Sequence, residues 1–114
     1  NPIMRRFGFL PAMAIVVHRG RSSGREYRTP VLAFPTDQGL VIALVYGLEV
    51  DWLKNVLAAG SCTVIRRGRP IEVGNPRVVG WAAGSKPMPI AVRLALLGVQ
   101  ARDFLLLDSV SADT

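Results

Sequence analysis

The sequence is poor in the side chains on which many enzyme mechanisms depend. Its 114 residues include one cysteine, Cys62, one histidine, His18, and only 7% aromatic residues. A single cysteine excludes an internal disulfide and favours a reducing, cytoplasmic location. With no second histidine or cysteine, we expect no metal site. The low aromatic content argues against base stacking on single strands, and we expect no nucleic-acid partner.

Long hydrophobic runs are also absent. No segment reaches the roughly 18 apolar residues that a membrane-spanning helix requires, and no signal-peptide pattern is present. The chain begins at Asn1 rather than Met, so we expect a fragment or a trimmed chain. Hydrophobic residues make up 50% of the sequence and charged residues 19%. This composition predicts one globular domain over residues 1–114, with 1–11 as an amphipathic lead-in.

Acidic residues are the scarcer of the two charged classes. Eight Asp and Glu stand against 14 Lys and Arg, which gives a net charge of +6. This balance favours a polyanionic ligand or contact with an anionic membrane surface.

The few candidate catalytic side chains have ordinary structural interpretations. His18 ends an apolar segment and Cys62 lies within one, so we expect both to be structural. Glu49 and Asp51 flank the start of a predicted helix, where the helix dipole favours acids. The residues needed for acyl transfer, metal-dependent hydrolysis or glycoside cleavage are therefore missing. Hydride transfer from a bound cofactor needs no protein nucleophile and remains open.

The most informative segment is 18–31, His-Arg-Gly-Arg-Ser-Ser-Gly-Arg-Glu-Tyr-Arg-Thr-Pro-Val. Glycines let backbone N–H groups converge, serines add donors, and guanidinium groups match the oxygens of phosphates and carboxylates. The spacing is neither that of a Walker A loop nor G-x-G-x-x-G. We interpret the segment as an anion-binding turn between two strands. A solvated arginine-rich turn is the alternative.

The hydrophobic pattern predicts a mainly β protein with six to seven antiparallel strands and two short helices. Asp51 is expected to cap the first helix and Gly60 to end it, while Gly98 ends the second. Pro30 should lie at a sheet edge or a bulge. Without a βαβ rhythm, this order indicates a small antiparallel barrel. The predicted strands are 12–18, 25–34, 40–46, 62–67, 70–79 and 104–110, and the predicted helices are 51–59 and 89–97.

Three motifs in order resemble the deazaflavin-dependent nitroreductase family of the flavin/deazaflavin oxidoreductase superfamily. They are the segment 18–31, Val-Ile-Ala-Leu-Val-Tyr-Gly at 41–47 and Asp-Trp-Leu-Lys-Asn-Val-Leu at 51–57. The resemblance covers roughly residues 16–79. It implies a split β-barrel of the FMN-binding type and the cofactor F-420, a deazaflavin with a phosphate and an oligoglutamate tail. It also implies hydride transfer from the reduced cofactor to a small-molecule acceptor: a quinone, a nitro compound or an activated double bond.

The resemblance also assigns site residues. The turn would hold the phosphate and tail, the second strand would lie along the ring, and the loop after the third strand would line its other side. Many relatives have Lys where this chain has Ser22, which shifts phosphate binding toward backbone amides and Arg21. Relatives also have Gly-Gly and Pro before the tryptophan, which this chain lacks. The expected cofactor-binding residues are Arg21, Ser22, Ser23, Gly24, Arg25, Thr29, Pro30, Val31, Gly47, Trp52 and Asn55.

Two of these interpretations have structural alternatives. Tyr46, predicted at a strand end beside a glycine, is the candidate catalytic hydroxyl, and its alternative is a surface tyrosine. Trp52 is either a pocket wall or a core anchor.

Other functions also stay open. The same barrel could bind fatty acids or lie peripherally at the inner face of the membrane without turnover, since 4–10 and 90–97 are apolar beside arginines. It could also hold FMN. The sequence is compatible with a monomer or a homodimer.

Overall fold

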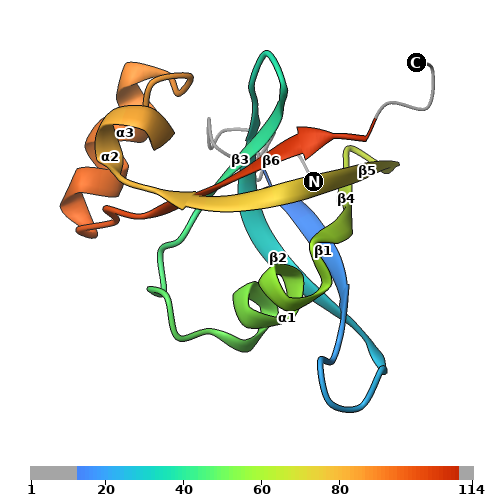
Figure 1. Ribbon diagram of the computed structural model, residues 1–114. Helices are drawn as coiled ribbons and strands as arrows, with labels where there is room; N and C mark the ends of the chain where they lie inside the picture. The colour runs from blue at the N-terminus through green and yellow to red at the C-terminus, as the bar shows by residue number, and fades with distance from the viewer. Residues whose placement is uncertain (1–12, 111–114) are drawn as a thin grey trace, which may run out of the picture.

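The computed structural model describes residues 13–110, and in this part of the chain six antiparallel strands close a barrel (Figure 1). The strands follow the barrel in the order β1-β2-β3-β6-β5-β4. This confirms the predicted mainly β, antiparallel barrel. The predicted lead-in, residues 1–11, lies outside the described residues. The strands are β1 (Met13–Arg19), β2 (Glu26–Pro35), β3 (Gly39–Ala43), β4 (Ser61–Arg66), β5 (Arg69–Val79) and β6 (Phe104–Ser109).

The same residues form three helices rather than the two expected. They are α1 (Asp51–Ala59), α2 (Trp81–Gly84) and α3 (Ile90–Gly98). α2 was not predicted because four residues are too short to show a helical period. Tertiary packing holds it instead: Trp81 packs on Phe104 with ring centroids 5.8 Å apart. A Cβ atom added at Gly84 would overlap the Phe104 ring, so only glycine fits there.

Two apolar clusters lie on opposite faces of the barrel wall at β3 and β6. Along β3, Leu40 and Ile42 belong to the cluster that packs against α1, while Val41 and Ala43 belong to the cluster with Met88. Successive side chains of a strand point to opposite faces, so a strand covered on both faces is apolar throughout. This explains why the sequence of β3 shows no alternation.

The helices cover different parts of the barrel. α2 and α3 lie together at one side, whereas α1 lies near the turn between β1 and β2 (Figure 1). The connection 44–50 runs from the end of β3 to α1 (Figure 1). None of the helices in residues 13–110 is long and apolar enough to cross a membrane.

Three local predictions can be compared with this structure. Pro30 pairs with Ile15 of β1, and the pairing of β2 with β3 starts only at Ala33, so Pro30 lies at a local edge as expected. Gly60 ends α1 in the left-handed conformation (φ 78°), also as expected. The predicted strand 40–46 is too long, because β3 ends at Ala43.

The predicted capping role of Asp51 is wrong. Val50 is the N-cap residue, and no side chain makes a capping hydrogen bond to the backbone there. Asp51 is instead the first helical residue, and its carboxylate pairs with Arg21 at 3.2 Å. The Asp51 carboxylate thus contacts Arg21, a partner brought near by the fold, and does not cap the helix.

Candidate functional site

The turn 20–25 between β1 and β2 is closed by its own backbone. The N–H of Gly20 donates to the carbonyl of Arg25, and the N–H of Gly24 donates to the carbonyl of Gly20, both at 2.8 Å. Gly24 has φ 72°, a conformation that glycine adopts at little cost. The Ser23 hydroxyl accepts from the N–H of Arg25 at 3.2 Å. Within residues 13–110, the N–H groups of Ser22 and Ser23 have no acceptor and are free to bind an anion.

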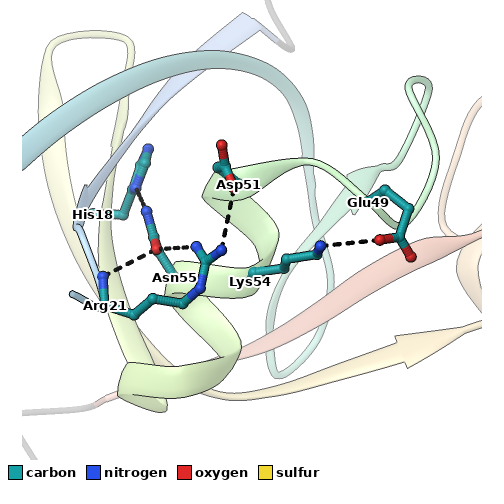
Figure 2. Close-up of polar contacts among 6 residues, drawn as sticks. All are labelled: His18, Arg21, Glu49, Asp51, Lys54 and Asn55. Carbon is teal, nitrogen blue, oxygen red and sulfur yellow. Dashed lines mark hydrogen bonds and ion pairs between the residues drawn. The ribbon is translucent and has the colours of Figure 1, made fainter.

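Arg21 ties this turn to α1. Its backbone N–H and its Nη1 both donate to Asn55 Oδ1, at 3.1 and 2.7 Å, and Nη2 contacts Asp51. Figure 2 shows the Asn55 side chain between Arg21 and His18, with Asp51 on the far side of the guanidinium. Arg21 was expected to be a cofactor ligand. In the structure both of its terminal nitrogens already have protein partners.

His18 continues this hydrogen-bonded group toward β2. Its Nδ1 lies 3.0 Å from Asn55 Nδ2, and its Nε2 lies 3.0 Å from Thr29 Oγ1. The ring stacks on Tyr27 with centroids 5.8 Å apart. Burial lowers the pKa of His18 below its ordinary value. The side chain is thus buried and hydrogen-bonded at both nitrogens, and its burial favours the uncharged ring.

A cleft of about 620 Å³, here called the polar cleft, opens between the turn, β2 and α1. It collects six of the residues predicted to bind cofactor: Arg21, Ser22, Ser23, Thr29, Trp52 and Asn55. Gly24 and Arg25, also predicted, do not line it. Its remaining lining residues are His18, Gly20, Tyr27, Arg28 and Asp51.

The residues assigned to cofactor binding from the sequence did not include these remaining ones, although four of them belong to segment 18–31, which was interpreted as an anion-binding turn. Arg28 could have been found, because it belongs to the same arginine-rich segment and lies three residues after the turn. His18 and Asp51 carried no such signal, since each had a structural interpretation.

A second, apolar pocket of about 490 Å³ adjoins the polar cleft; we call it the apolar slot. The two cavities share Thr29 and Trp52. The slot brings together two predicted segments that lie far apart in sequence, 29–31 and 46–47. Trp52 is 8% exposed and belongs to the core cluster against α1, so it serves both as core anchor and as pocket wall.

Tyr46 lies at the rim of the slot rather than in its depth. Because β3 ends early, Tyr46 is in the connection to α1, and its side chain is 84% exposed. Gly47 follows it with φ 86° and donates its N–H to the carbonyl of Leu44 at 3.1 Å. The Tyr46 hydroxyl is therefore accessible to a small molecule entering from solvent.

Tyr46 also borders a third cavity, the α3 groove, of about 630 Å³. This groove lies between α3 and the residues Leu32 and Val45, and its lining is mainly apolar. The outer face of α3 is apolar too, with Ile90, Leu94 and Leu97 more than half exposed.

The other reactive side chains lie outside these three cavities or are already paired. Cys62 is buried, and burial together with Glu72 raises the pKa of its thiol to about 11. Glu49 pairs with Lys54 at 2.9 Å, an ion pair separate from the His18 group (Figure 2). No group of three His, Cys, Asp or Glu residues within 13–110 is placed to hold a metal ion.

No known family model matches the chain, and no curated protein matches it.

Proposed function

We propose that the protein is an oxidoreductase that binds reduced coenzyme F-420 and directs its hydride to a quinone, a nitro compound or an activated double bond. The observation that carries this proposal is the junction of the polar cleft and the apolar slot at Thr29 and Trp52. A cofactor with a flat ring and an anionic tail needs two such adjoining environments. Neither a simple anion nor a neutral hydrophobic ligand needs both.

The residues present suit the two ends of such a cofactor. Ser22, Ser23 and Arg28 line the polar cleft. The N–H groups of the two serines have no acceptor within residues 13–110, and the Arg28 guanidinium, 3.6 Å from Glu26, is 61% exposed, so both kinds of donor suit phosphate and carboxylate oxygens. Residues 29–31 and 46–47 line the slot, whose mainly apolar lining suits the ring. Arg21 supports the shape of the turn through Asn55 and Asp51, so its role is partly structural.

This site requires little chemistry from the protein. The cofactor, when bound, supplies the hydride, and the protein positions it against the acceptor at the apolar slot. The Tyr46 hydroxyl at the rim of the slot can donate a hydrogen bond to the oxygen of an acceptor as negative charge develops there. Asp51, the acid that lines the polar cleft, pairs with Arg21 at 3.2 Å.

A fluorescence titration with F-420 and with FMN tests binding. We expect micromolar or tighter affinity for F-420, at least about tenfold weaker affinity for FMN, and weakening of both as salt rises. Arg28→Ala should weaken F-420 binding about tenfold. Arg69→Ala is the matched control, because it removes the same charge far from the polar cleft. Arg69 pairs with Arg66, and Arg66 pairs with Ala14, at the end of β1 opposite the turn. FMN binding that equals or exceeds F-420 binding contradicts the proposal.

The α3 groove supports a second candidate function, the binding of a fatty acid or another lipid without turnover. Its apolar lining and the exposed leucines of α3 offer a surface that an acyl chain could cover. Displacement of a fluorescent fatty acid measures this directly. Tight fatty-acid binding together with no F-420 binding would favour this function over the first.

A further inference from the structure

The hydrogen bonds around His18 can be assigned a direction, starting from Arg21. A backbone N–H and a guanidinium can only donate hydrogen bonds. Both contact the same atom of the Asn55 side chain, at 3.1 and 2.7 Å, so that atom must be the amide oxygen. The orientation of this buried amide is therefore fixed by its partner, and its NH₂ group faces His18.

The orientation of Asn55 fixes the tautomer of His18. The amide NH₂ can only donate, and it lies 3.0 Å from Nδ1 of the ring. Nδ1 must then accept and carries no proton. In a neutral imidazole the proton is consequently on Nε2, which donates to Thr29 Oγ1 at 3.0 Å.

Thr29 is the last member of this group, and the proton of its hydroxyl still requires an acceptor. Its oxygen accepts from His18, so its own O–H must point away from the ring. No residue within 13–110 accepts a hydrogen bond from this hydroxyl. Thr29 is half-buried and lines both the polar cleft and the apolar slot.

We propose that His18 is a positioning residue, which, held by Asn55 as the Nε2–H tautomer, makes the Thr29 hydroxyl an obligatory hydrogen-bond donor at the junction of the two cavities. The ligand group it selects is a hydrogen-bond acceptor at the edge of a flat ring, such as a ring carbonyl oxygen. The identity of that ligand as F-420 rests on the proposed function; the direction of the hydrogen bonds does not.

Because His18 is the only histidine in the sequence, nitrogen NMR of the imidazole gives an unambiguous test without any ligand. At neutral pH we expect Nδ1 to show the chemical shift of an unprotonated nitrogen and Nε2 that of a protonated one. A proton on Nδ1 would overturn the proposal.

Asn55→Asp is the matched variant, since it keeps the shape and the acceptor for Arg21 but replaces the NH₂ donor with a carboxylate oxygen. We expect the proton of His18 to move to Nδ1 and the pKa of the ring to rise. An unchanged nitrogen spectrum in this variant would also overturn the proposal, whereas a purely structural asparagine would leave the tautomer alone.

The consequence for binding is measured with oxidised F-420 and two Thr29 variants. Thr29→Val removes the hydroxyl at nearly constant shape and should weaken binding about tenfold, while Thr29→Ser keeps the hydroxyl and should stay within about twofold of the natural protein. Equal affinity of all three proteins would overturn the proposed role of Thr29. Failure of the natural protein to bind F-420 would contradict the proposed function instead, and the NMR result would still decide the tautomer.

Discussion

Replacement of Asn55 by alanine tests how strongly one buried side chain couples the arginine-rich turn to α1. Asn55 is 5% exposed and accepts two hydrogen bonds from Arg21 while donating one to His18. Its removal leaves the buried Nδ1 of His18 without a partner and frees the turn from the helix. We expect both the folding stability and the shape of the polar cleft to depend on it.

The expected loss of stability can be estimated term by term. A buried acceptor left without a donor costs about 1–3 kcal/mol. The charge-assisted hydrogen bond from Arg21 contributes about 1.5 kcal/mol at the low end of its range, because the Arg21 side chain is 40% exposed and water replaces part of it. Alanine restores about 0.5 kcal/mol as the better helix former. Asn55→Ala should therefore lower the free energy of unfolding by about 2–4 kcal/mol, and the Tm by roughly 10 °C or more.

Urea denaturation followed by circular dichroism measures this change, with Lys54→Ala as the control on the same helix. Lys54 pairs with Glu49, whose side chain is 89% exposed, and such surface pairs contribute little. We expect Lys54→Ala to change stability by no more than about 0.5 kcal/mol. If the two variants were equally stable, the account of Asn55 as the link between turn and helix would be refuted.

Three further predictions concern packing, pH and reactivity. Gly84→Ala should destabilise the fold by about 1–3 kcal/mol because the added methyl meets the Phe104 ring, whereas Gly98→Ala, in open space, should be neutral or slightly stabilising when both are measured by thermal unfolding. The lowered pKa of His18 means that the unfolded state takes up a proton first on acidification. The free energy of unfolding should therefore keep its full His18 contribution above about pH 6.5 and fall as the pH drops below that value. Chemical denaturation at several pH values should show a smaller decline in His18→Gln. The Cys62 thiol, with its pKa raised to about 11 and its side chain buried, should react with a thiol reagent at pH 8 much more slowly in the folded protein than in urea; equal rates would show that it is accessible.

The strands were predictable because their apolar residues are contiguous and their boundaries carry turn residues. The end of β3 was not, because Leu44 and Val45 continue the apolar pattern after the strand has ended. The N–H of Leu44 still donates to the carbonyl of Asp103, one step beyond the last β3–β6 pair, and the chain then turns at Gly47. How far β3 pairs with β6 depends on the tertiary fold, which no local pattern reveals. The same reason hides α2, whose four residues depend on Phe104.

The site was predictable to the extent that its residues lie in contiguous motifs. The segments 29–31 and 46–47 were both named from sequence, and the structure places them around one slot. The group formed by His18, Arg21 and Asn55 was not predictable, because it joins residues 34 and 37 positions apart through the way α1 packs against the turn. Arg21 consequently lines the polar cleft with both of its terminal nitrogens already paired within the protein.

The most direct test of the central claim is the single-turnover oxidation of reduced F-420, followed by stopped-flow absorbance with a quinone, a nitro compound or an activated alkene as acceptor. We expect the protein to accelerate oxidation by at least one of these acceptors, and Tyr46→Phe to slow that reaction about tenfold without weakening cofactor binding. A protein that binds reduced F-420 yet accelerates its oxidation by none of the three acceptors would contradict the account.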